Sequence, residues 1–82
     1  MKLAKVTISF KDGVLDPQEA AVKAKLLESG YKAIKEMKQL KQFEIKLNVE
    51  NEEEAEVIVR EICEKFLANP VIEDYKFEIM EV

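Results

Sequence analysis

Hydrophobic and polar residues alternate along three stretches of the chain, which is the pattern of a β-strand with one buried face. In residues 3–10 the apolar side chains stand at every second position, and the last of them is Phe10. The same period of two runs through residues 41–50 and through residues 71–80. These three stretches are predicted to be strands.

The segment after the first strand carries the signals of a helix start. Asp16 is a good N-cap because its carboxylate can accept a hydrogen bond from a free backbone N–H, and Pro17 suits the first helical position. Glu19 follows Asp16 by three residues, which completes a pattern like a capping box. Gly30 is a typical helix stop, so we expect a helix over residues 17–29.

That helix has two apolar stripes on roughly opposite sides. One stripe is formed by Ala20, Ala24 and Leu27, and the other by Val22 and Leu26. One of them is expected to face the sheet. The other is either scattered surface apolarity or a contact with another chain, and the pattern does not decide between the two.

A second helix is predicted after Asn51, which is its cap, with three acidic residues at 52–54 that favour the positive end of the helix dipole. Asn69 and Pro70 are expected to end it. Its core stripe is predicted to consist of Ala55, Ile58, Val59, Ile62 and Phe66, widened by Cys63 and Leu67.

Residues 31–42 are ambiguous, because their apolar positions recur every three residues. We interpret residues 33–40 as an irregular strand that pairs with residues 41–50 through a turn near Leu40. The predicted order is then β-α-β-β-α-β in a single domain, residues 1–82. This is an α+β, ferredoxin-like split βαβ fold: an antiparallel four-stranded sheet with both helices on one face and the first and third strands at its centre.

Composition and charge exclude several functions. The 82 residues carry a net charge of −4, with 13 basic and 17 acidic side chains, so no nucleic acid partner is expected. No apolar run approaches the roughly 18 residues of a membrane span, and the first residues lack the apolar core of a signal peptide. A cytoplasmic protein without a membrane partner is therefore expected.

The residues needed for self-contained chemistry are scarce. The chain has no His and one Cys, which excludes an internal disulfide and a zinc site. Cys63 lies on an apolar helix face and is interpreted as a small buried side chain. Acidic residues near turns, such as Asp12 and Asp16, have local turn or cap roles. No catalytic, cofactor-binding or metal residue is predicted, so the isolated chain is not expected to be an enzyme.

Two stretches are more distinctive than the predicted fold. They read GVLDPQ at residues 13–18 and LANPVIEDY at residues 67–75. Together they closely resemble the PurS family, the small subunit of phosphoribosylformylglycinamidine synthase, and the likeness spans essentially the whole chain. The departures fall mostly in residues 33–42, where family members often have a Gly at a hairpin turn.

The resemblance implies a role in de novo purine (IMP) biosynthesis. The family's enzyme converts formylglycinamide ribonucleotide, ATP and glutamine into the amidine, glutamate, ADP and phosphate. A PurL-like synthetase subunit binds ATP and Mg²⁺, a PurQ-like glutaminase subunit releases ammonia, and PurS bridges the two and assists ammonia transfer. The chain is thus expected to be a non-catalytic subunit without a cofactor of its own, forming a homodimer or a higher homo-oligomer. The alternative hypothesis is a small-ligand-binding regulatory module of ferredoxin-like fold.

If the chain bridges two partners, the exposed residues of the two motifs are the candidate interface. Each of them also has a possible local role at a helix start, a helix stop or a strand entry. The candidate partner-interface residues are Asp16, Pro17, Gln18, Asn69, Pro70 and Asp74.

Overall fold

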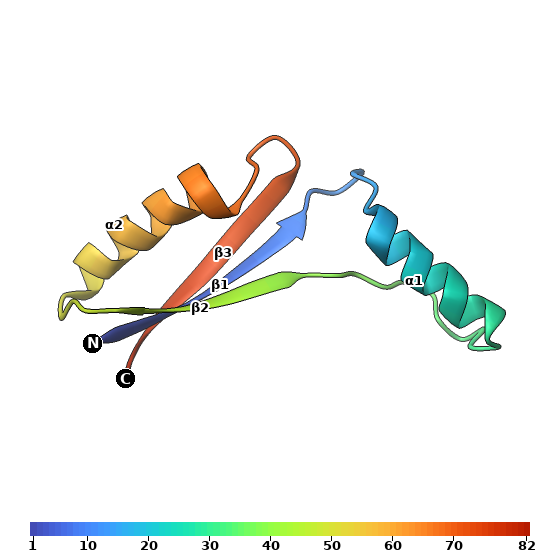
Figure 1. Ribbon diagram of the computed structural model, residues 1–82, viewed down its shortest axis with the longest axis horizontal. Helices are drawn as coiled ribbons and strands as arrows, with labels where there is room; N and C mark the ends of the chain where they lie inside the picture. Colours follow the sequence, from blue (N-terminus) through green and yellow to red (C-terminus); the bar gives the residue numbers. More distant parts are fainter.

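The computed structural model describes all residues, 1–82. It contains three strands and two α-helices, the second of which ends in a short π-helical turn (Figure 1). In chain order the elements are β1 (Lys2–Phe10), α1 (Pro17–Glu28), β2 (Lys41–Leu47), α2 (Glu52–Ile62), the π-turn η1 (Cys63–Leu67) and β3 (Glu73–Glu81).

The strands form one antiparallel sheet in the order β2-β1-β3. In the register of this sheet, Val6 of β1 lies between Phe43 and Phe77, and residues directly opposite each other point to the same face. The alternation of the sequence therefore gives the sheet one apolar face. α2 packs on that face against β1 and β3.

The hydrophobic core is small and lies between α2 and the central strand. It is formed by Ala4, Val6, Ile8, Val59, Cys63 and Ala68, with Ala55 also buried. Asn51 caps α2 as predicted, because its side-chain oxygen accepts a hydrogen bond from the Glu54 N–H at 3.1 Å. The burial of Cys63 is likewise confirmed.

The prediction of a four-stranded, ferredoxin-like sheet is wrong. Residues 33–40 form no strand, and β2 therefore lies at an edge of the sheet rather than at its centre. The apolar side chains of this segment recur every three residues, so they cannot share one face of a strand. Side chains of α1 hold the segment instead: Lys23 donates to the Lys35 carbonyl at 3.2 Å, and Glu19 accepts from the Gln39 N–H at 2.7 Å.

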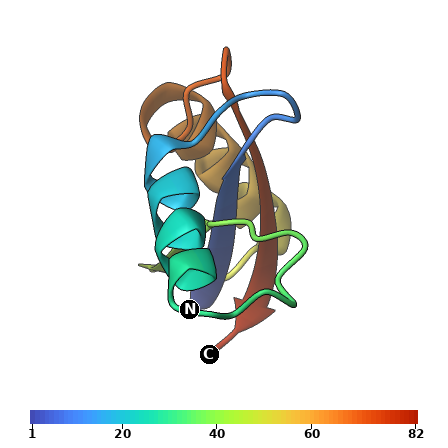
Figure 2. The ribbon, with the colours of Figure 1, turned by 90° about the vertical axis from the view of Figure 1, so that its right-hand side faces the viewer.

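The expected packing of both helices on the sheet is also wrong for α1. None of its residues is buried, and together with the return segment 29–40 it forms an arm that leaves the end of the sheet (Figure 1). Figure 2 looks along the long axis, with α1 nearest the viewer and the sheet behind it. The chain measures 50 × 28 × 15 Å, and its radius of gyration of 16.3 Å exceeds the roughly 12 Å of a compact chain of this length.

No helix of the structure is both long enough and apolar enough to span a lipid bilayer.

Candidate partner interface

The two distinctive sequence stretches come together at one end of the sheet, where the arm departs. The loop that follows β1 and the loop that precedes β3 are joined by a backbone hydrogen bond from the Lys11 N–H to the Ile72 carbonyl at 2.8 Å. The Lys11 ammonium also lies 3.9 Å from the Asp74 carboxylate. Residues more than fifty positions apart therefore form one continuous surface, which we call the loop end (residues 11–18 and 66–75).

The first loop is shaped by its polar residues. The Asp16 carboxylate accepts hydrogen bonds from the N–H groups of Gln18, at 3.0 Å, and Glu19, at 3.2 Å, and Pro17 takes the first helical position. The capping box is only half formed, because Glu19 binds Gln39 of the arm. The Gln18 side-chain oxygen also accepts from the Gln39 side-chain amide at 2.9 Å, so Gln18 ties the helix start to the return segment.

The second loop is a hydrogen-bonded turn around Asn69. Its side-chain oxygen accepts from the Val71 N–H at 3.1 Å, and its own N–H donates to the Glu73 carboxylate at 2.8 Å. Its carbonyl accepts from Ile72 and Glu73. This turn places Pro70 and Val71 at an exposed tip, and Asp74 faces Lys11 of the other loop.

The structure thus brings all six candidate interface residues to the loop end and gives several of them local partners. Asp16, Asn69 and Asp74 hold the loops in shape, and Pro17 and Pro70 occupy exposed positions. Their contact with a partner stays a prediction.

Three apolar side chains of the loop end were missed as candidates. Phe66 is 80% exposed, Val71 78% and Leu15 76%, and these are the highest values among the exposed large hydrophobic residues. Leu15 and Val71 lie inside the two motifs. A large apolar residue within a turn segment is the sequence feature that could have identified them as interface candidates. Rigid loops that present apolar side chains to solvent are typical of protein-binding surfaces.

Phe66 was predicted to be in the core, and that prediction is wrong. The last turn of the helix widens to a π-turn, in which the Ala68 N–H donates to the Cys63 carbonyl at 2.9 Å. The extra residue in the turn shifts the register of the side chains that follow Cys63. Ala68 is buried in consequence, and Phe66 is turned toward solvent.

The charged groups around the second loop have partners. The Tyr75 hydroxyl donates to the Glu64 carboxylate at 2.9 Å, and this bond, together with burial, raises the pKa of Tyr75. An open depression of about 420 Å³ lies here, bordered by Lys11, Glu64, Ala68, Pro70, Glu73, Asp74 and Tyr75. No group of three or more His, Cys, Asp or Glu side chains is arranged to hold a metal ion.

Cys63 has the environment of a structural thiol. Its side chain is fully buried in the core, and burial raises the pKa of the thiol, so the neutral form is favoured. A nucleophile needs the thiolate and access to a substrate, and Cys63 has neither.

Comparison with known proteins points to one family. Residues 3–81 match the family model described as PurS: Phosphoribosylformylglycinamidine (FGAM) synthase. The phosphoribosylformylglycinamidine synthase subunit PurS of Bacillus subtilis is 40% identical over 82 residues, which cover 100% of this chain and 96% of that protein. Its counterpart in Methanocaldococcus jannaschii is 38% identical over 82 residues, with 100% and 99% covered.

Solved structures give the same result. The crystal structure of Methanocaldococcus jannaschii PurS, described as one of the subunits of formylglycinamide ribonucleotide amidotransferase in the purine biosynthetic pathway, superposes with a TM-score of 0.89 at 38% identity and covers 100% of this chain and 99% of that one. A chain in the structure of PurLQS from Thermotoga maritima superposes with a TM-score of 0.83 at 26% identity, with 98% and 99% covered.

Proposed function

The chain belongs to the PurS family, a subunit of phosphoribosylformylglycinamidine synthase in purine biosynthesis, and from this premise we propose that it bridges the synthetase and the glutaminase of that enzyme. The single observation that supports bridging most directly is the loop end. There the two family motifs lie side by side, with Leu15 and Val71 exposed within them and Phe66 exposed directly before the second.

The partners that fit this proposal are a PurL-like synthetase subunit and a PurQ-like glutaminase subunit. A Thermotoga maritima relative of this chain occurs in a PurLQS structure. ATP and Mg²⁺ would be bound by the synthetase and the nucleophilic Cys would belong to the glutaminase, because Cys63 here is buried and burial raises the pKa of its thiol. This chain would then hold the two active sites in the relative position that lets ammonia pass between them, in the cytoplasm.

The shape of the chain supports self-association as a part of this function. Its accessible surface of 6229 Å² is about 1,200 Å² larger than the roughly 5,000 Å² expected of a compact monomer of 9.5 kDa. A stable interface buries about 800 Å² on each partner. The excess surface is therefore about one and a half times what one such interface buries on a chain, which leaves ample surface for a homodimer contact.

The alternative, a small-ligand-binding regulatory module, was based on a ferredoxin-like fold. The three-stranded sheet removes that basis. The depression at the loop end is open and the charges that border it already have partners, which does not favour a small ligand.

The bridging proposal is tested by reconstitution with the synthetase and the glutaminase of the same organism. The Leu15→Asp/Val71→Asp variant should lower glutamine-dependent activity at least tenfold, because a buried, unpaired carboxylate disrupts an apolar contact. Ammonia-dependent activity of the synthetase should be unchanged. Val57→Asp is the matched control, since Val57 is 61% exposed on α2, away from the loop end.

Wild-type glutamine-dependent activity that does not require this chain at all would refute bridging. Equal activity of the loop-end variant and the Val57→Asp control would show that the loop end is not the bridging surface.

A further inference from the structure

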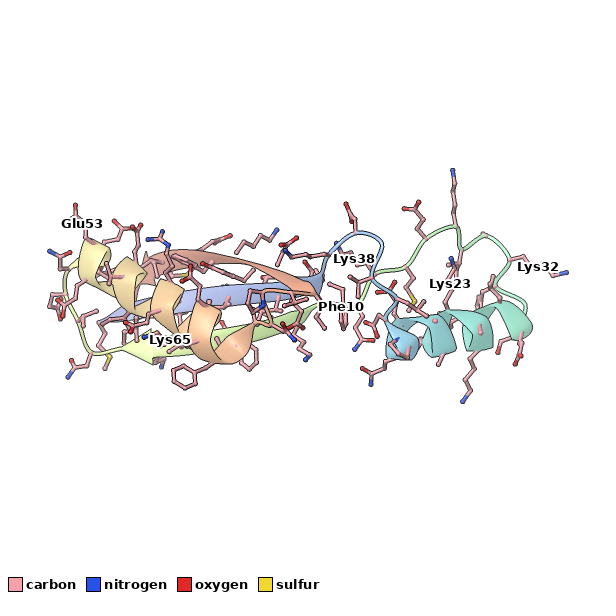
Figure 3. The ribbon with its side chains drawn as sticks, turned by 90° about the horizontal axis from the view of Figure 1, so that it is seen from above. Phe10, Lys23, Lys32, Lys38, Glu53 and Lys65 are labelled. Carbon is pink, nitrogen blue, oxygen red and sulfur yellow. The ribbon has the colours of Figure 1, made fainter.

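The outer edge of β3 is unpaired along its whole length. β3 comes last in the strand order β2-β1-β3, and it is nine residues long. Natural edge strands are usually kept from pairing by a proline, a β-bulge, a short length or several lysines. β3 has no proline, its register with β1 runs without a bulge, and Lys76 is its only lysine. Figure 3 shows β3 along one edge of the sheet, with the arm beyond the end of β1 at Phe10, so this edge is open to another strand.

The hydrogen bonds between β1 and β3 show which backbone groups face outward. The Lys11 N–H donates to the Ile72 carbonyl at 2.8 Å, and the Val82 N–H donates to the Met1 carbonyl at 3.3 Å. Both bonds continue the β1–β3 register, so the even-numbered residues of β3 exchange hydrogen bonds with β1. The odd-numbered residues therefore direct their N–H and C=O groups away from the sheet.

The side chains of the same odd-numbered residues form an apolar row on the face that α2 covers. Tyr75, Phe77 and Ile79 pack against the core but are only half-buried, because no strand lies on their outer side. The rings of Tyr75 and Phe77 are stacked with their centroids 6.4 Å apart, and the Arg60 guanidinium lies 5.7 Å from the centre of the Phe77 ring. An added strand would gain backbone hydrogen bonds and apolar contacts along one line.

The opposite face of β3 carries charges that indicate which strand fits. Lys76 and Glu78 are exposed, and neither forms an ion pair within the chain. When a second β3 pairs in antiparallel orientation about a two-fold axis at Phe77, Lys76 of each copy lies opposite Glu78 of the other. The same register sets Phe77 opposite Phe77 and Tyr75 opposite Ile79. β3 is thus complementary to itself in charge and in shape.

Neighbouring registers lack this complementarity. The outward-facing groups of two copies can pair only when the two-fold axis passes through a residue position, so the nearest alternatives move it by one residue. An axis at Lys76 sets two lysines against each other and Asp74 against Glu78, and an axis at Glu78 sets two glutamates together. In the register centred on Phe77 the like-charged contact is at the strand ends, where Glu73 meets Glu81, and Glu81 already has Lys2 as an ion-pair partner.

We infer that two copies of the chain associate through the outer edges of β3, in antiparallel register centred on Phe77, to form one continuous sheet with three strands from each copy. This contact goes beyond the proposed function. It uses neither α1 nor the loop end, so it leaves the proposed bridging surface free.

The register is tested by exchanging charges. Lys76→Glu and Glu78→Lys should each raise the dissociation constant of this association at least about tenfold in about 50 mM salt, because the two-fold axis repeats every unfavourable pair. An equimolar mixture of the two variants should regain wild-type affinity, since the introduced carboxylate of one faces the introduced ammonium of the other. Sedimentation equilibrium measures all three samples. Lys46→Glu is the matched control, with an equal change of charge at an exposed position of β2.

Failure of the mixture to regain affinity, or an equal loss in the Lys46→Glu control, would overturn the register. The pairing of the edges is tested separately by amide hydrogen exchange. In the associated wild type the amides of Phe77 and Ile79 should be protected, and in Lys76→Glu they should exchange at least about tenfold faster, whereas those of Glu78 and Met80 stay protected in both. Equally fast exchange of Phe77 and Ile79 in both proteins would show that the edge is open and overturn the inference.

Discussion

Val57 and Val59 lie two positions apart on α2 and have opposite environments. Val59 is fully buried against the sheet, whereas Val57 is 61% exposed. The difference follows from the helical period, because a step of two residues turns a side chain through about 200°. The helical period would place Phe66 in the core as well. Phe66 lies in the π-turn, however, where the period changes, and its ring faces solvent.

Val59→Ala should lower the free energy of unfolding by about 2 kcal/mol, because it removes two buried methyl groups and leaves a cavity in a small core. Val57→Ala, the matched control, should change it by less than about 0.5 kcal/mol. Urea denaturation followed by circular dichroism measures both. A loss of the same size in the two variants would contradict the placement of α2.

At the scale of the elements, local sequence signals determine where the two helices start, whereas tertiary packing determines how much of each helix is buried. Both caps form as their sequences indicate, with Asp16 accepting from Gln18 and Glu19 and Asn51 accepting from Glu54. The two helices nevertheless differ in how they are packed. α2 buries Ala55 and Val59, whereas α1 buries nothing and is held to its return segment by polar side chains.

Asn51→Ala should destabilise the protein by about 1 kcal/mol, because the Glu54 N–H loses its acceptor and α2 is coupled to the core. Asn48→Ala is the control at a nearby exposed position outside the helix, and it should be close to neutral. The two variants can be compared by thermal and urea unfolding. Equal stability of both would show that the cap contributes little to the fold.

At the scale of the whole molecule, the chain is too extended to be a self-sufficient unit. The radius of gyration of 16.3 Å and the unburied α1 share one explanation. A protomer that leaves about 1,200 Å² of extra surface in water gains stability when a second copy covers it. Folding and dimerisation are therefore expected to be coupled.

Such coupling makes the melting temperature depend on protein concentration. A hundredfold dilution should lower it by about 5–10 °C, because mass action favours separated, unfolded chains. Scanning fluorimetry or calorimetry from about 1 to 100 µM measures the shift. A melting temperature that stays constant over this range would mean that the folded monomer is stable alone.

The sequence by itself determined the features that depend on neighbouring residues. The three regular strands, the caps at Asp16 and Asn51 and the burial of Cys63 follow from period, turn chemistry and hydrophobicity, which act within a few residues of each other. The family followed in the same way from two short motifs.

Only the tertiary structure decided how these elements meet. It showed that residues 33–40 are the return leg of an arm, that α1 leaves the sheet, and that Phe66 joins Leu15 and Val71 in facing solvent. An amphipathic helix reads the same whether it covers its own sheet or that of a second chain, because the burial of apolar surface has no preferred direction. The direction of the arm is set by side-chain contacts across twenty residues, such as Glu19 to Gln39, which no local period reveals.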